Sequence, residues 1–147
     1  MIKANLFRTT IFSGLAVFVI TSMLTLSSCG LGGVKSAAIQ TTLKKVAEEV
    51  NKSCPMTVDS ETRLDNTLFK PESTLQYNYT LVNYEKADLN VDTLINNMRP
   101  NILNLIKTNP DLESLRKLDV TFEYSYRDKS GASVCQIVIT PDDYKTK

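Results

Sequence analysis

Two stretches of the chain carry apolar residues three or four positions apart, the spacing that places them on one face of a helix. The first covers 34–50, with Lys and Glu side chains on its other face, and the second covers 94–106. Asp92 is the expected N-terminal cap of the second helix. Pro100 lies inside that helix and removes a backbone hydrogen bond to Asn96, so we expect a kink there.

Other stretches alternate apolar and polar residues, as half-buried strands do. The clear examples are 75–81, 118–127 and 132–140. Asp128–Gly131 predicts a hairpin turn between the last two, with glycine free to adopt a left-handed conformation. Weaker strand signals over 56–69 compete with a long irregular loop, and 142–147 reads as a polar tail after Pro141.

This order of elements, helix–strand–strand repeated twice, predicts an α+β fold. We expect an antiparallel sheet of about four strands with the two helices packed on one face. The apolar and aromatic positions of the strands would then meet the helices. The alternate positions, including Gln76, Asn78 and Glu123, would face water.

The N-terminal segment follows a different pattern. Lys3 and Arg8 precede an uncharged apolar stretch that closes with the sequence Leu26-Ser27-Ser28-Cys29. This pattern resembles a bacterial lipoprotein signal peptide over 1–28, with the lipobox ending at Cys29, whose thiol is acylated. An uncleaved membrane anchor and a plain secretory signal are the alternatives.

Cleavage before Cys29 would leave a lipidated cysteine and a glycine-rich flexible tether over 29–33, followed by one domain over 34–147. Fatty chains on Cys29 would attach the protein to a membrane. Gly30 is not the aspartate that retains lipoproteins at the inner membrane in enteric-type sorting. We therefore expect an outer-membrane location facing the periplasm.

Composition excludes several kinds of chemistry. Without residues 1–28 the chain has 15 basic and 16 acidic side chains, a net charge of −1, which argues against a nucleic-acid partner. The chain has no histidine, so Ser-His-Asp and Cys-His catalysis and imidazole zinc sites are excluded. No cofactor-binding or catalytic motif is present. We therefore expect no enzyme activity and no cofactor.

Cys54 and Cys135 remain once Cys29 is assigned to lipid. In an oxidising compartment these two can form a disulfide, which would close a loop of about 80 residues and stabilise the fold by roughly 4 kcal/mol. The alternative is two packed free thiols, because cysteine behaves as a small apolar residue. Neither cysteine is expected to be a nucleophile.

Asp59, Glu61 and Asp65 form the best carboxylate cluster in the sequence. They are a weak candidate for a divalent-cation site, although no glycine occupies the turn that an EF-hand loop requires. A polar turn between strands, with Arg63 pairing locally, is the main interpretation. Tyrosines on the predicted strands could form a stacking platform, but alternating aromatic residues more often form cross-strand pairs in a core.

Several segments of the mature chain resemble a family of small, uncharacterised exported bacterial proteins. The resemblance covers 54–65 and 75–81 in the first half, and 122–128, Gly131 and 139–142 in the second half. It runs in order through nearly the whole mature chain. The family has no established activity, so the resemblance implies export rather than a reaction.

Two classes of function follow from these observations. The first is a membrane-tethered, non-enzymatic binding or assembly module that receives an envelope protein or peptide at a sheet edge or a helix groove. A pilotin-like or envelope-maintenance role fits this class by analogy of architecture. The alternative is a periplasmic hydrolase or metal-binding protein built on the carboxylates.

Overall fold

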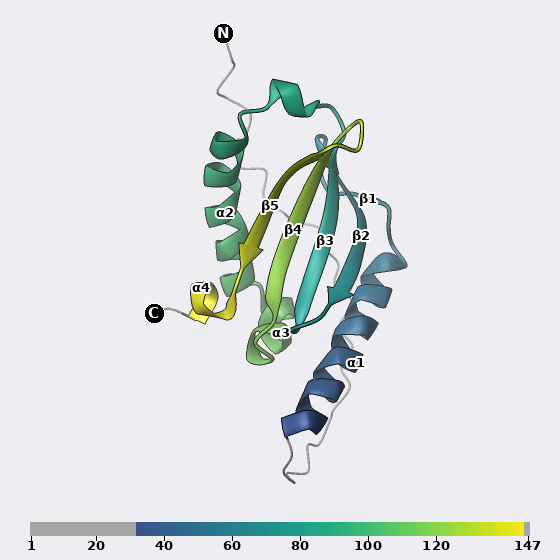
Figure 1. The fold of residues 1–147 in the computed structure, drawn as a ribbon, viewed down its shortest axis with the longest axis vertical. Coiled ribbons are helices and arrows are strands. Elements are labelled where there is room, and N and C mark those ends of the chain that lie inside the picture. The colour runs from purple at the N-terminus through teal and green to yellow at the C-terminus, as the bar shows by residue number, and fades with distance from the viewer. Residues whose placement is uncertain (1–31, 146–147) are drawn as a thin grey trace.

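The computed structural model describes residues 32–145 of the 147-residue chain. The expected signal peptide and the lipidation site at Cys29 lie outside the described residues. Figure 1 shows a twisted sheet with one long helix beside each of its two edges. The elements, in chain order, are α1 (Gly32–Asn51), β1 (Met56–Thr57), β2 (Thr62–Lys70), β3 (Thr74–Leu81), η1 (Lys86–Asp88), α2 (Val91–Thr108), η2 (Pro110–Leu112), α3 (Glu113–Lys117), β4 (Thr121–Asp128), β5 (Ser133–Ile139) and α4 (Pro141–Lys145).

The predicted α+β class is confirmed, and the detail of the sheet is corrected. The sheet has five strands in the order β1-β2-β3-β4-β5 rather than about four. All neighbouring strands are antiparallel except β3 and β4, which are parallel, so the sheet is mixed. The uncertain stretch 56–69 forms β1 and most of β2.

The parallel pair follows from the path of the chain between its two strands. After β3 the chain returns through α2 and α3 to the end of the sheet where β3 began. There the backbone N–H of Thr121 donates to the carbonyl of Ser73 over 3.1 Å. A strand followed by a helical crossover enters the sheet in the same direction as its predecessor, whereas a short hairpin reverses it.

Helix α1 buries side chains mainly in its C-terminal half, and Ile39 is partly buried against the same core. Leu43 and Ala47 are buried, while most side chains between 37 and 42 are exposed. The helix contacts β2 and, to a lesser extent, β3. Its first residue is Gly32, so it begins two residues inside the expected tether. In Figure 1 its N-terminal half projects beyond the end of the strands.

Helix α2 packs beside β5 and runs through Pro100, as its apolar spacing predicts. Its cap is Asn90 rather than the expected Asp92, because the Asn90 side chain accepts the backbone N–H of Thr93 over 2.9 Å. Asp92 lies in the first turn, where its charge still complements the helix dipole. Asn109 caps the following turn, where its side chain accepts the backbone N–H of Asp111 over 2.8 Å.

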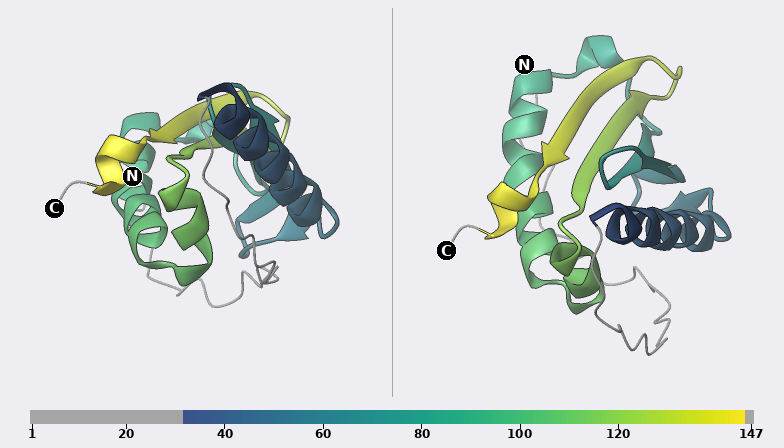
Figure 2. Two further views of the ribbon diagram at one scale, coloured as in Figure 1. Left: turned by 90° about the horizontal axis from the view of Figure 1, so that it is seen from below. Right: turned by 60° about the horizontal axis from the view of Figure 1, so that its bottom comes forward.

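One core lies between the helices and one face of the sheet. The strand register aligns the inward residues of β3 and β4, so that Tyr77 lies opposite Tyr124 and Leu75 opposite Phe122. Buried residues of α1 and α2 belong to the same cluster as these inward residues. Both long helices therefore cover the same face, as predicted, and Figure 2 shows them near opposite edges of the sheet, with α2 beside β5 and α1 beside β2.

Two boundaries near the C-terminus differ from the sequence prediction. Strand β4 begins at Thr121 rather than at Leu118, since α3 continues to Lys117 and the backbone turns at Asp119. The expected polar tail contains helix α4, whose Tyr144 is 7% exposed. The hydroxyl of Tyr144 donates to the carbonyl of Val120 over 2.9 Å, so this terminal helix closes the core. Within residues 32–145, no helix has the length and apolar character that a membrane span needs.

Candidate functional site

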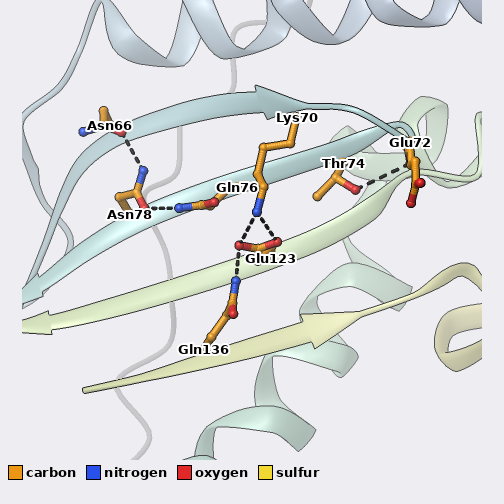
Figure 3. Close-up of polar contacts among 8 residues, drawn as sticks. All are labelled: Asn66, Lys70, Glu72, Thr74, Gln76, Asn78, Glu123 and Gln136. Carbon is orange, nitrogen blue, oxygen red and sulfur yellow. Dashed lines mark hydrogen bonds and ion pairs between the residues drawn. The ribbon is translucent and has the colours of Figure 1, made fainter. Parts of the chain in front are cut away.

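The second face of the sheet is polar, and we call it the polar face. It is formed by the strand positions that alternate with the core positions, and Figure 3 looks onto it. Its residues include Arg63, Asn66, Leu68, Lys70, Gln76, Asn78, Thr80, Glu123, Ser125, Arg127, Gln136 and Val138. Leu68 and Val138, which are 47% and 37% exposed, are the exposed large apolar side chains of the described residues, and both lie on this face.

Glu123 is the most enclosed charge on the polar face. Its carboxylate accepts two hydrogen bonds from the ammonium of Lys70, at 2.9 and 3.0 Å, and a third from the side-chain amide of Gln136 (Figure 3). These two side chains cover Glu123, which is only 7% exposed although we expected it in water. The carboxylate is therefore satisfied by its own neighbours and is not available to a ligand.

Three amide side chains form a hydrogen-bonded row across β2 and β3. Gln76 donates to the side-chain oxygen of Asn78 over 2.5 Å, and Asn78 donates to the side-chain oxygen of Asn66 over 2.7 Å (Figure 3). The row has a direction, so its two ends differ. Within the described residues, the amide nitrogen of Asn66 and the amide oxygen of Gln76 are left without partners.

The amide row borders a shallow hollow of about 330 Å³. The hollow is lined by Asp65, Asn66, Leu68, Gln76, Asn78 and Arg127. Asp65 already accepts from Arg63 over 2.6 Å and from the hydroxyl of Thr80 over 2.5 Å. The side chain of Arg127 is exposed on β4 and has no hydrogen-bond or ion-pair partner in the described part of the chain.

Both edges of the sheet are partly closed by side chains. On one side β1 pairs only with Arg63 and Leu64, so β2 forms the edge beyond them. There the amide of Asn51 donates to the carbonyl of Thr67 over 2.8 Å and accepts the N–H of Thr67 over 2.6 Å. At β5, the guanidinium of Arg99 donates to the carbonyl of Val138 over 2.6 Å and to Asp143 over 2.9 Å. Covered backbone groups cannot pair with an incoming strand, so strand addition is disfavoured at these positions.

The predicted carboxylate cluster does not converge. Asp59 accepts the backbone N–H of Glu61 in the turn between β1 and β2, and Glu61 accepts from the Asn83 amide over 2.8 Å. Asp65 is directed to other partners on β2 and β3. Between residues 32 and 145, no three metal-ligating side chains are grouped closely enough to hold an ion. The polar-turn interpretation therefore fits Asp59 and Glu61.

The tyrosines form cross-strand pairs in the core. Tyr77 stacks on Tyr124 with ring centroids 5.4 Å apart, and Tyr79 stacks on Tyr126 at 5.1 Å. Burial raises the pKa of Tyr77 to about 12 and raises the pKa values of Tyr124 and Tyr126 well above their ordinary range. These rings are parts of the fold rather than an exposed stacking platform.

Cys54 and Cys135 are both free thiols in the structure. Cys54 precedes β1 at one edge of the sheet, and Cys135 lies in β5 at the other edge. A disulfide between them stays a prediction. Burial raises the pKa of both thiols, which makes them poorer nucleophiles.

Residues 37–135 match the family described as a domain of unknown function (DUF8479), and the chain belongs to this family. The match covers most of the described residues, from α1 into β5. It agrees with the expected resemblance to a family of small proteins without an established activity. No curated protein sequence shows significant similarity to the chain.

Solved structures with the same fold come from exported proteins and secretion systems. A candidate secreted protein of Pseudomonas aeruginosa has a TM-score of 0.66 at 13% identity, covering 76% of this chain and 97% of that one. The pilotin EpsS of the Vibrio vulnificus type 2 secretion system has a TM-score of 0.62 at 7% identity, covering 78% and 99%. The pilotin AspS of the Vibrio cholerae type II secretion system has a TM-score of 0.59 at 11% identity, covering 76% and 96%.

Sequence reasoning did not find the hollow on the polar face. The alternation of β4 does place Arg127 on the same side as Glu123, and that of β3 places Gln76 with Asn78. What brings Arg127 beside β3 is the parallel register, in which Arg127 lies opposite Thr80. That register depends on the crossover, which local alternation does not encode.

Proposed function

We propose that this chain is a lipoprotein of the bacterial cell envelope that acts as a non-enzymatic binding or assembly module for an envelope protein or peptide. The observation that carries the proposal is the fold shared with two type II secretion pilotins over nearly their whole lengths. At this level of identity the likeness concerns the fold alone. The Leu26–Cys29 sequence supports the same class of function independently, since it predicts lipidation at Cys29.

In this proposal the signal peptide over 1–28 is removed, and Cys29 carries fatty chains in the outer membrane. The domain over 34–147 then faces the periplasm. Two or more acyl chains give stable attachment, because each buried methylene contributes roughly 0.8 kcal/mol. The projecting half of α1 is the part of the domain nearest to the anchor in sequence. Both long helices pack on the other face of the sheet, so neither covers the polar face.

A carboxylate-based hydrolase or metal-binding protein has less support. The three candidate carboxylates, Asp59, Glu61 and Asp65, each have separate partners in the turn and on the strands. The enclosed Glu123 is neutralised by Lys70. General acid–base catalysis requires a group that can reach the proton it transfers, and of these four carboxylates only that of Asp65 lines the hollow.

Lipidation is tested by metabolic labelling with an alkyne fatty acid in a bacterial host. We expect the full chain to be labelled and to fractionate with the outer membrane, and Cys29→Ala to remain an unlabelled precursor. Cys54→Ala is the matched control, since it removes a different thiol and should keep the label. Normal labelling of the Cys29→Ala variant would refute the anchor.

Partner binding is tested by photo-crosslinking in intact cells. A photoreactive residue is placed at Leu68 or Val138 on the polar face, and at Lys107 on the exposed side of α2 as the control. We expect one discrete adduct with an envelope protein from the polar-face positions and none from the control. The same adducts from all three positions, or none from any, would count against a binding module that uses this face.

A further inference from the structure

Among the four arginines of the described residues, Arg127 is the one whose guanidinium has no hydrogen-bond or ion-pair partner there. The other three are held by acidic side chains or by backbone carbonyls: Arg63 by Asp65, Arg99 by Asp143, and Arg116 by the carbonyls of Ile106 and Asn109. A guanidinium presents five N–H donors in a planar fork. Arg127 therefore offers an unused anion-binding group at the edge of the hollow on the polar face.

The hollow provides further groups suited to a ligand beside Arg127. The amide nitrogen at one end of the row, on Asn66, is a free donor, and the amide oxygen at the other end, on Gln76, is a free acceptor. Leu68 lies in the same lining and is 47% exposed. The hollow thus combines a cation, a neutral donor, an acceptor and an apolar surface.

We propose that this hollow binds a carboxylate group of a peptide partner, with Arg127 as the anion-binding residue. The inference rests on the proposed function and names the chemistry of its partner. The planar fork of a guanidinium matches the two oxygens of a carboxylate, and Asn66 supplies a further donor. The oxygen of Gln76 would accept a backbone N–H next to that carboxylate, while Leu68 would contact an apolar side chain of the same peptide.

A phosphate group fits the hollow less well than a carboxylate. Asp65 also lines the hollow, and its negative charge would repel a doubly charged phosphate more strongly than a singly charged carboxylate. The charges that line the hollow therefore favour a carboxylate over a free phosphate.

Binding is tested with the full chain purified in detergent and titrated with acetylated dipeptides by NMR. The probes are N-acetyl-Ala-Leu with a free C-terminal carboxylate, the same dipeptide as its C-terminal amide, and N-acetyl-Asp-Leu amide. We expect the resonances of the hollow residues to shift with the first or the third probe and not with the second. Comparing the first and third probes tells a C-terminal carboxylate from an acidic side chain.

Variants assign the binding to Arg127. We expect Arg127→Gln to weaken the binding of the carboxylate probe by about tenfold or more, and Arg127→Lys to weaken it less, because lysine keeps the charge and loses the fork. Lys107→Gln is the matched control, since it removes one exposed positive charge from α2 and should leave binding unchanged. Both positions are exposed, so the fold should tolerate the changes.

Three results would overturn the inference: equal binding of the acid and amide dipeptides, equal binding by the Arg127→Gln variant, or tighter binding of inorganic phosphate than of either carboxylate probe. If the carboxylate probes fail while Leu68 still crosslinks to an envelope protein, only this inference fails. If the probes bind while no envelope protein is crosslinked, the carboxylate site stands and the proposed assembly role fails.

Discussion

Asn51 takes the place of a neighbouring strand for Thr67. Its side-chain amide meets both the N–H and the carbonyl of Thr67, so one residue at the end of α1 makes the two hydrogen bonds that a strand residue would make. This pairing fixes the C-terminal end of α1 to β2. It also covers backbone groups that would otherwise be exposed at the edge of the sheet.

Replacing Asn51 with alanine should destabilise the fold and expose this edge. Two hydrogen bonds are lost, each contributing about 1 kcal/mol, so we expect the free energy of unfolding to fall by roughly 2 kcal/mol. Urea denaturation measures the loss, and size-exclusion chromatography measures any self-association. Asn51→Asp keeps the acceptor for the N–H of Thr67 but sets a carboxylate oxygen against the Thr67 carbonyl, so it should also be less stable than the natural chain. An unchanged stability in the alanine variant would show that the pairing contributes nothing.

The side chain of Thr67 is fully buried, and its hydroxyl oxygen lacks a hydrogen-bond partner among the described residues. Thr67→Val removes this unsatisfied group at nearly constant volume, and the backbone bonds to Asn51 remain possible. We expect stability to rise by about 1 kcal/mol in chemical denaturation. Thr67→Ser keeps the hydroxyl and removes the methyl group, so it should lower stability instead. A loss of stability in the valine variant would mean that the hydroxyl is satisfied.

Pro100 is exposed on α2 and cannot donate a backbone hydrogen bond to Asn96. Pro100→Ala restores that donor and removes the ring from the preceding turn, so we expect α2 to persist and stability to rise by about 2 kcal/mol. Thermal denaturation followed by circular dichroism measures the change. Asn104→Ala, at an exposed position of the same helix, controls for helix propensity alone and should give only a few tenths of a kcal/mol. A smaller gain from Pro100→Ala than from this control would be contrary to expectation.

Asp128 links the β4–β5 turn to η1 through its carboxylate. One oxygen accepts from the hydroxyl and the N–H of Ser130 and from the N–H of Ala132, and the other accepts from the N–H of Lys86. These hydrogen bonds, that from the Ser130 hydroxyl first, lower the pKa of Asp128 to about 2. The folded state therefore binds this proton more weakly than the unfolded state, where the pKa is about 3.9.

The stabilisation from Asp128 should be complete above about pH 5 and should be lost as the pH falls through the folded pKa of about 2. We expect Asp128→Asn to be less stable than the natural chain at neutral pH, and the two stability curves to converge in this acid window. Ser130→Ala removes the largest cause of the lowered Asp128 pKa, so the pH range over which stability is lost should become narrower. Urea denaturation between pH 2 and pH 7 measures all three curves. Curves that stay parallel across the window would contradict the assignment.

Elements with strong local patterns could be predicted from the sequence. The alternation of 75–81 identified β3, and the turn at Asp128–Gly131 identified the β4–β5 hairpin, where Gly131 has a φ of +87°. Apolar spacing identified both long helices and their shared face of the sheet. In each case the decisive interactions lie within the element or its nearest turn.

Features that depend on distant contacts could not be predicted. Tyr144 lies in a stretch that is polar by composition, and its burial requires the carbonyl of Val120 to be within reach. The alternation of β4 predicts that Glu123 is exposed, but Lys70 covers it from another strand. The position of Arg127 beside the amide row likewise depends on the parallel register of β3 and β4.

That parallel register gives the protein a spectroscopic signal that reports on its own tertiary folding. The chain has no tryptophan, and four of its six tyrosines stack in rows across the β3–β4 boundary. Ordered aromatic packing is what produces near-ultraviolet circular dichroism. The near-ultraviolet band of this protein should therefore report chiefly on the pairing of β3 with β4. It should vanish when these two strands separate, even if the helices persist.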